Sequence, residues 1–336
     1  MSSVVSVVAL KPVNKTETQR TQRLHREDVK TTSFHFHSFA KINWFLRILG
    51  KRPDGYHEVI TALQTVSLCD DLTFDLRDDS EIILSCDDPE IPTDNTNLIV
   101  KAALALQNRL QTALGAEIKS TKRIPAKGGL GGASSNAAVT LMALNLLWRG
   151  ALNINDLMLL ASDLGADVPF FLVGGRGLGT GTGTSVSELA DGPKQHLIVV
   201  TPNANVSTAN AYASLNAGSL TTSNTASILS SSLAEVISAD SRQWPLHNDF
   251  ERVIFEIEPE IERVKVALLE AGARGALLAG SGSSVFGVFD DEAARDRVID
   301  NLRCEAGWRV FSCDTVGRTE YFRATNSSGL PLFTLS

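Results

Sequence analysis

The spacing of hydrophobic and polar residues changes several times along this chain. Residues 33–49 (SFHFHSFAKINWFLRIL) alternate at first and then continue as unbroken apolar positions, which predicts a strand that ends at the turn-forming GKRPDGYH. Residues 117–124 alternate as well, and residues 136–148 place apolar side chains at helical spacing. The glycine-rich segment between these last two stretches therefore joins a strand to a helix.

Further elements are predicted toward the C-terminus. The glycine-alternating GLGTGTGTS at residues 177–185 is typical of a loop or a flexible edge. The apolar HLIVVTP at residues 196–202 predicts a buried strand. We also expect a helix over residues 154–164, an amphipathic helix over residues 261–273 capped by Gly272, and a strand, turn and strand over residues 276–289.

Two stretches lack such periodicity. Residues 1–32 are rich in Ser, Thr, Lys and Arg, and we expect a disordered leader, since its acidic residues count against an organelle-targeting peptide. Residues 218–232 are rich in Ser, Thr and Ala, which predicts a mobile connection. A length of 336 residues favours two domains with a ligand cleft between them, and we place the domains at residues 33–193 and 194–330.

Composition narrows the classes of function. With 43% hydrophobic residues, 21% charged residues and a net charge of −7, the chain is typical of a globular protein and offers no electrostatic reason to expect a nucleic-acid partner. Apolar runs are too short to span a bilayer, and the four cysteines form no CxxC pair. We therefore expect a cytoplasmic protein that acts on a small molecule and does not associate with a membrane. We expect it to be a monomer or a homodimer.

The glycine-rich segment PAKGGLGGASS carries the strongest chemical signal. Its glycines and small side chains, set between a strand and a helix, allow backbone N–H groups to approach a phosphate closely. The segment matches neither GxxxxGK[ST] nor GxGxxG, and the alternative is a turn that only packs a helix on a sheet. As a phosphate cradle it comprises Pro125, Ala126, Lys127, Gly128, Gly129, Leu130, Gly131, Gly132, Ala133, Ser134 and Ser135.

Four motifs in this order resemble the GHMP kinase superfamily, and within it the family of diphosphocytidyl-methylerythritol kinases. They are AKINWFLRILGKRPDGYH, IPAKGGLGGASSNAA, GADVPFF and AGSGSSVFG, which together span most of the chain. The resemblance implies an α+β, two-lobed fold, with an N-terminal lobe like the second domain of ribosomal protein S5 and a C-terminal ferredoxin-like lobe. It also implies an ATP-dependent kinase, with Mg²⁺, that phosphorylates the 2-hydroxyl of diphosphocytidyl-methylerythritol in the non-mevalonate route to isoprenoids.

The same resemblance assigns two catalytic residues. Asp167, in GADVPFF, would orient or deprotonate the acceptor hydroxyl, and Lys41, in AKINW, would keep Asp167 ionised and screen the phosphate oxygens. Taken alone, Asp167 reads equally well as a helix cap before Pro169, and Lys41 as a solvated lysine on a strand. Ser135 is a candidate magnesium ligand, with Asp156 or Asp163 as a source of a carboxylate.

A substrate with a cytidine diphosphate head group is expected at DGYH. Tyr56 and His57 stand side by side and can stack on a pyrimidine and hydrogen-bond its edge, although the same residues also fit a plain surface turn. The resemblance adds Asn43 and Thr208 to the substrate side. His35 and His37 suggest an HxH metal pair, but strand alternation explains them and the sequence shows no third ligand.

The chain departs from the family pattern at three positions. Phe39 stands where Pro is common, Lys127 where small residues are common, and Ala133 where a loop glycine is common. Lys127 adds positive charge where phosphates would lie, whereas the sequence gives Phe39 no interpretation. Two rival functions remain at this point: another GHMP kinase, acting on a mevalonate derivative, homoserine or a sugar, and a non-catalytic nucleotide- or RNA-binding module.

Overall fold

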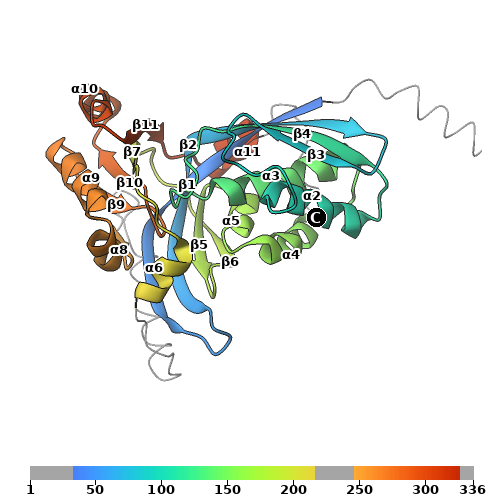
Figure 1. Ribbon diagram of the computed structural model, residues 1–336, viewed down its shortest axis with the longest axis horizontal. Helices are drawn as coiled ribbons and strands as arrows, with labels where there is room; N and C mark the ends of the chain where they lie inside the picture. The colour runs from blue at the N-terminus through green and yellow to red at the C-terminus, as the bar shows by residue number, and fades with distance from the viewer. Residues whose placement is uncertain (1–32, 216–245, 326–336) are drawn as a thin grey trace, which may run out of the picture.

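The computed structural model describes residues 33–215 and 246–325 (Figure 1). The expectations for the leader at residues 1–32, for the connection at residues 218–232 and for the last residues of the second predicted domain lie outside the described residues. Among the residues that are described, none of the helices is both long and apolar enough to cross a membrane.

Two long antiparallel strands form the frame of the first lobe. Strand β1 (Ser33–Lys51) pairs with β2 (His57–Arg77) along nearly its whole length, with register shifts between Phe39 and Ala40, between Asn43 and Phe45 and between Ile48 and Gly50. These irregularities bend the ribbon and change which side chains face which layer. The sheet has the order β3-β4-β2-β1-β8, and β5 pairs with both β2 and β6. Its other strands are β3 (Ile82–Cys86), β4 (Gly115–Thr121), β5 (Arg176–Thr180), β6 (Ser185–Leu189) and β8 (His247–Asn248).

Helices cover one face of this sheet (Figure 1). They are α2 (Leu98–Leu110), α3 (Gly132–Leu147), α4 (Ile154–Leu164) and α5 (Val168–Val173). Helix α3 lies at the centre and is buried on nearly all sides from Ser135 onward, which explains why its sequence is apolar all round rather than striped. Side chains of α2, α3 and α5 form one continuous core with the inward residues of β1, β2 and β4.

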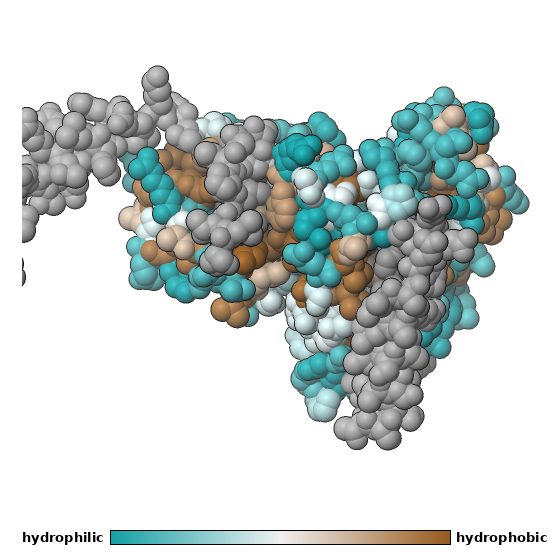
Figure 2. Space-filling model, turned by 180° about the vertical axis from the view of Figure 1, so that it is seen from behind, coloured by the Kyte–Doolittle hydropathy of each residue, from teal (hydrophilic) through white to brown (hydrophobic). Residues whose placement is uncertain are grey.

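The second lobe is a four-stranded antiparallel sheet. Its order is β11-β7-β10-β9, which is the order of the split βαβ, ferredoxin-like arrangement. Hydrophilic residues dominate the outer surface around α10, at the upper right of Figure 2. The elements of this lobe are β7 (His196–Pro202), α6 (Thr208–Ser214), α8 (Glu251–Ile257), α9 (Pro259–Glu270), β9 (Gly275–Leu278), β10 (Val285–Phe289), α10 (Glu292–Arg303) and β11 (Trp308–Asp314).

The two lobes share a hydrophobic core. Ile42 and Trp44 of β1 pack with Val199 of β7 and Phe286 of β10, and the rings of Trp44 and Phe286 meet edge to face at 5.5 Å. The chain then returns to the first lobe, because helix α11 (Arg318–Thr325) packs on β1. This return explains Phe39, whose ring lies 5.7 Å from that of Tyr321 on α11.

Most of the predicted elements are present, and the deviations have physical reasons. Residues 122–124 belong to the loop rather than to the strand, and α3 already begins at Gly132. GLGTGTGTS was expected to be a loop or a flexible edge, but its first half is β5, a strand held on both sides by β2 and β6. A side chain at Gly177 would crowd Phe170 and one at Gly179 would crowd Thr61, so glycine is required there by packing.

Candidate active site

The glycine-rich segment forms a loop between β4 and α3 whose backbone is left-handed at several positions. Gly129 and Gly131 have φ of 73° and 71°, and Lys127 adopts 58°, which is uncommon for a residue with a side chain. A Cβ atom at Gly131 would lie 2.9 Å from the ring of Phe171 and 3.0 Å from Cγ of Lys41. Glycine at this position therefore lets the loop pass directly over Lys41.

The AGSGSSVFG motif of the second lobe holds this loop in place. The backbone N–H of Ser283 donates to the carbonyl of Lys127 at 3.2 Å, and that of Ser284 donates to the carbonyl of Gly128 at 3.1 Å. The hydroxyl of Ser284 in turn shares a hydrogen bond of 2.7 Å with Thr201 at the end of β7. Two motifs that are far apart in the sequence thus form one unit.

The loop leads into the N-terminus of α3, which is suited to an anion. Gly131 is the N-cap residue, and the first turn, which begins with Gly132, Ala133 and Ser134, carries no acidic side chain. The backbone N–H groups of a first helical turn lack partners within the helix and lie at the positive end of the helix dipole. Lys127 adds a positive charge beside this turn, so the arrangement can bind phosphate groups.

Asp70 anchors the base of the loop, and sequence reasoning missed it. Its carboxylate is fully buried and accepts hydrogen bonds from the backbone N–H groups of Arg123 and Ile124, both at 2.8 Å, and from Nδ2 of Asn136 at 3.1 Å. It also forms an ion pair with Lys122. The available signal was the pair of adjacent carboxylates, Asp70 and Asp71, within β2.

The structure brings Lys41 and Asp167 together. Nζ of Lys41 lies 3.4 Å from Oδ2 of Asp167 and donates a hydrogen bond of 2.8 Å to Oδ1 of Asn43. The side chain of Lys41 is only 4% exposed, whereas that of Asp167 is 38% exposed. Asn43 is itself oriented, since its Nδ2 donates to the hydroxyl of Thr61 at 2.8 Å. The solvated-lysine alternative for Lys41 is therefore excluded.

Asp167 occupies the N-cap position of α5 but does not act as a cap. Within the described part of the chain its side chain makes no hydrogen bond to the first turn of the helix, and its backbone is already helical, with φ of −85°. Pro169 follows inside that turn, as the sequence suggested. The carboxylate is consequently available to Lys41 and to whatever lies in the adjoining cavity.

A cavity of about 1330 Å³ joins these parts. Its lining includes the glycine-rich loop, Lys41, Asn43, Asp167 and residues of the second lobe. Of the eleven residues predicted to form the cradle, Pro125 to Ser134 line the cavity. This volume and this mixture of apolar walls with a few polar groups fit two small-molecule ligands placed end to end.

A stacked pair of rings joins β2 to α6, and of the two rings Tyr212 lines the cavity whereas His57 does not. His57, the first residue of β2, lies with its ring centroid 4.8 Å from that of Tyr212 on α6, at an interplanar angle of 25°. Burial lowers the pKa of His57, with a smaller contribution from the charge of Lys51. Burial, together with the nearby charge of Asp167, raises the pKa of Tyr212 to about 12. Both rings are therefore uncharged at neutral pH, and Tyr212 keeps its proton for donation.

Of the other predicted substrate residues, Thr208 lines the cavity, whereas Tyr56 is exposed to solvent. Thr208, at the start of α6, lines the cavity and shares a hydrogen bond of 2.9 Å with Ser281. Tyr56 is 67% exposed at the tip of the β1–β2 turn. Tyr212, which lines the cavity in its place, was missed because nothing in its local sequence, NAYAS, distinguishes it from an ordinary helix residue.

The candidate magnesium ligands are also dispersed. Ser135 is fully buried and accepts a hydrogen bond of 2.7 Å from Ser38 of β1, while its neighbour Ser134 lines the cavity. Asp156 accepts from Arg109 at 2.9 Å on the helical layer, and Asp163 is exposed on α4. Among the described residues, the carboxylates that line the cavity are those of Asp88, Glu90 and Asp167.

Comparison with known proteins shows which class of protein this chain resembles. Residues 97–175 match the family model of the N-terminal domain of GHMP kinases, and residues 225–307 match that of the GHMP kinase C-terminal region. A crystal structure of homoserine kinase from Cytophaga hutchinsonii superimposes with a TM-score of 0.67 at 20% identity, over 86% of this chain and 96% of that one. The fold is that of the GHMP kinases.

More similar relatives narrow the class. The 4-diphosphocytidyl-2-C-methyl-D-erythritol kinase of Solibacter usitatus is 38% identical over 83% of this chain and 89% of the relative, and that of Geobacter sp. (strain M21) is 40% identical over 82% and 97%. A crystal structure of 4-(cytidine 5′-diphospho)-2C-methyl-D-erythritol kinase superimposes with a TM-score of 0.71 at 31% identity, covering 84% and 99%. The chain belongs to the 4-diphosphocytidyl-2-C-methyl-D-erythritol kinase family of ATP-dependent GHMP kinases.

Proposed function

We propose that this protein transfers the γ-phosphoryl group of ATP to the 2-hydroxyl of 4-diphosphocytidyl-2-C-methyl-D-erythritol, releasing ADP and the 2-phosphate in the non-mevalonate route to isoprenoid precursors. The observation that carries the proposal is the position of the Lys41–Asp167 pair, 3.4 Å apart in one cavity that also contains an anion-binding loop and ends near stacked aromatic rings. Each part supplies one requirement of the reaction.

The acceptor end favours a flat, uncharged base. Tyr212 lines the cavity and stacks on His57, and a neutral imidazole both donates and accepts hydrogen bonds, which suits the donor and acceptor edge of cytosine. A base bound on Tyr212 leaves its diphosphate and alcohol to extend toward Asp167, whose charge contributes to the raised pKa of that tyrosine. Mevalonate and homoserine have no base to occupy this pocket.

At the reaction centre, the two polar side chains divide the work. Asp167 accepts the hydroxyl proton, or orients the hydroxyl, as the oxygen attacks the γ-phosphorus. Lys41 pairs with the carboxylate at 3.4 Å and is close enough to the loop to balance charge on the transferring phosphoryl group. Asn43 fixes the direction of the ammonium group.

The phosphates of ATP would bind at the loop and at the first turn of α3. Oxygen atoms of side chains that line the same cavity would bind Mg²⁺. The carboxylate of Asp167 and the hydroxyl of Ser134 are hard oxygen ligands that line the cavity, whereas Ser135 would have to leave its hydrogen bond with Ser38. When bound, Mg²⁺ would neutralise charge on the phosphate oxygens.

An ADP-release assay with a panel of acceptors tests the proposal. The full-length protein should release ADP with the cytidine diphosphate alcohol, and much more slowly with mevalonate, homoserine or galactose, while Asp167→Asn should release ADP roughly 10²–10⁴-fold more slowly than the wild type with the cytidine substrate. Preference for another acceptor would contradict the substrate, and ATP binding without transfer to any acceptor would indicate a non-catalytic module. The domain boundary at residue 193, the cytoplasmic location and the monomeric or dimeric state stay predictions.

A further inference from the structure

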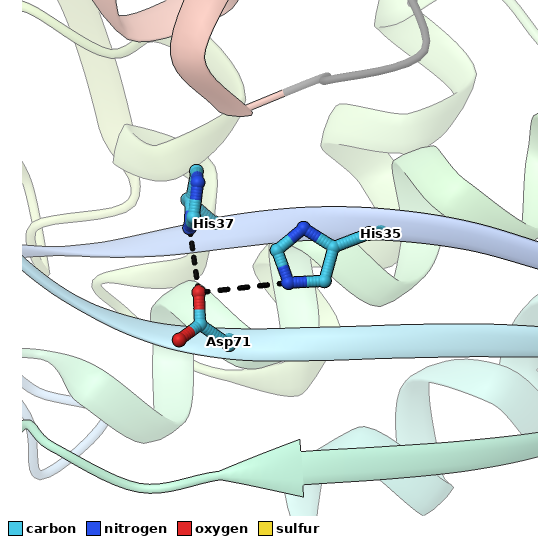
Figure 3. A group of neighbouring side chains, drawn as sticks. All are labelled: His35, His37 and Asp71. Carbon is cyan, nitrogen blue, oxygen red and sulfur yellow. Dashed lines mark hydrogen bonds and ion pairs between the residues drawn. The ribbon is translucent and has the colours of Figure 1, made fainter.

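Three potential metal ligands converge on the outer face of the first lobe. His35 and His37 are two residues apart on β1, so that their side chains project from the same face of the sheet. Asp71 of β2 stands opposite His37 in the strand register. Figure 3 shows both imidazoles directed at one carboxylate oxygen of Asp71.

The distances are close to those of a coordinated cation. Nδ1 of His37 lies 2.6 Å from Oδ1 of Asp71, Nε2 of His35 lies 3.7 Å from the same oxygen, and all the candidate ligand atoms lie within 4.8 Å of one another. Ligands of a tetrahedral zinc ion sit about 2.0–2.2 Å from the metal and hence roughly 3.3 Å from one another. Side-chain rotations that lengthen the contact between His37 and Asp71 and shorten the one between His35 and Asp71 would create the site.

We propose that His35, His37 and Asp71 bind a divalent transition-metal ion, with Zn²⁺ as the preferred ion, at a site separate from the reaction centre. Two imidazoles and one carboxylate match the nitrogen and oxygen ligands of zinc, whereas Mg²⁺ prefers oxygen ligands alone. Because the imidazole side chains are 45% and 37% exposed, an ion reaches them from solvent and water can complete its shell.

Arg123 is the charged group that faces this site most closely. Its guanidinium group lies 2.7 Å from Oδ2 of Asp71, which leaves Oδ1 directed at the histidines. Its positive charge opposes a second cation, so its removal should retain or strengthen binding.

Sequence alone did not disclose the third ligand, because Asp71 comes from the neighbouring strand. The competing interpretation is an ordinary pair between a histidine and an aspartate. The chain contains such a pair in the second lobe, where Nδ1 of His196 lies 2.9 Å from Oδ1 of Asp314. The described metal-ligand cluster differs from it by a second imidazole, and the two can be compared directly.

The test uses full-length protein without a polyhistidine tag, freed of metal with a chelator. Isothermal titration with ZnCl₂ should reveal a site that His35→Gln and His37→Gln each weaken by about tenfold or more. His196→Gln removes the imidazole of the ordinary histidine–aspartate pair in the second lobe, and it should bind Zn²⁺ as the wild type does. Excess MgCl₂ should not displace the zinc.

Co²⁺ provides a second readout that is independent of catalysis. The wild type should show the visible absorption of low-coordinate cobalt, and His37→Gln should lose it, while Arg123→Ala should retain or strengthen it. Because the imidazoles are half-exposed, their replacement by Gln should leave the melting temperature in chelator unchanged. The proposal is overturned if the two glutamine variants bind Zn²⁺ as tightly as the wild type, or if the wild type gives no cobalt spectrum.

Discussion

The side chain of Lys41 carries its charge in a nearly buried position. Removing an ammonium group from water is costly unless partners compensate it, and here they are the carboxylate of Asp167 and the amide oxygen of Asn43. Lys41 and Asp167 therefore compensate each other's charge and fix each other's direction. We expect two residues with such mutual dependence to act as one unit in catalysis.

For this reason we expect Asp167→Asn, which removes the base but keeps its shape, to lower turnover by roughly 10²–10⁴-fold with little change in either KM. Lys41→Ala should cost a comparable amount. The double variant should be scarcely slower than the slower single variant, because both changes disable the same step. Single-turnover phosphoryl transfer at saturating ATP measures these losses.

Asp163→Asn is the matched control, since that carboxylate is exposed on α4. It should turn over normally, and thermal melting of all the variants separates lost chemistry from lost folding. Losses that multiply in the double variant would mean that Lys41 and Asp167 act independently.

His57 and Tyr212 permit a test of the acceptor pocket. Replacing either ring by Ala should weaken the cytidine substrate by about 1–3 kcal/mol, the range observed for a lost stacking partner, while ATP affinity stays unchanged. Tyr56→Ala is the informative comparison, because this ring is adjacent in sequence but 67% exposed. The geometry predicts a smaller loss for Tyr56, and an equal loss would return Tyr56 to the binding surface.

The pH dependence of substrate binding follows from the environment of His57. Burial holds its pKa below the ordinary value of 6.5, so the ring is neutral in the folded protein at and above that pH. Affinity for the cytidine substrate should be level above pH 6.5 and fall as the pH drops through the lowered pKa. The free energy of unfolding changes in the same direction. Because the pKa of His57 is lower in the folded than in the unfolded protein, its contribution to stability is lost as the pH falls below 6.5. Binding by His57→Gln, measured by titration calorimetry, should lack this step.

At the scale of elements, the glycine-rich loop depends on its neighbours as much as on its own sequence. Gly131 was expected to leave room for phosphate, but the groups that a side chain would meet are Lys41 and Phe171. The loop thus restricts where the side chain of Lys41 lies. If the loop binds phosphate as proposed, it also aligns Lys41 with that phosphate.

We therefore expect Gly131→Ala to lower kcat as well as to raise the KM for ATP. The control is Gly272→Ala in the second lobe, which has a similarly left-handed backbone but open space around it. Both substitutions should reduce stability by about 1 kcal/mol, since alanine disfavours such a backbone. Only Gly131→Ala should impair transfer, as measured by steady-state kinetics alongside thermal melting. Normal kinetics in this variant would show that the loop does not position Lys41.

Elements with a clear period could be predicted from sequence, whereas contacts between them could not. Helix α4 and strand β7 end where their apolar spacing ends. Strand β5 could not be predicted, because its glycines are explained by close neighbouring side chains and give no alternation of apolar and polar residues. Periodicity places Lys41 on a strand and Asp167 before a helix without bringing them together, and only the family resemblance joined them. Tyr212 gave no local signal, and the adjacent carboxylates of Asp70 and Asp71 did not disclose their partners, because those partners come from segments far away in the sequence.

At the scale of the whole molecule, helix α11, which follows the second lobe in the chain, is fastened to helix α5 of the first lobe. Arg318 of α11 donates from Nε to the carbonyl of Val173 at 3.2 Å and from Nη2 to that of Arg176 at 2.6 Å. Tyr321 on the same helix donates to the carbonyl of Phe171. These contacts hold the C-terminal end of α5, the helix that begins directly after Asp167.

Arg318→Ala should accordingly lower the free energy of unfolding by about 1.5–3 kcal/mol, the value of hydrogen bonds made by a charged group. Arg323→Ala removes an exposed arginine from the same helix and should cost far less. Urea unfolding, followed by circular dichroism, measures both. If the two variants unfold at the same urea concentration, α11 does not contribute to the junction through Arg318.

The hydrogen bonds from Ser283 and Ser284 to the glycine-rich loop have a consequence for protein synthesis. Residues 125–135 leave the ribosome long before residues 279–284 have been made, so the nascent first lobe emerges without the segment that shapes its loop. We expect a ribosome-bound chain to acquire affinity for ATP only after that later segment has emerged. Most of the polypeptide is thus translated before any of it can bind nucleotide.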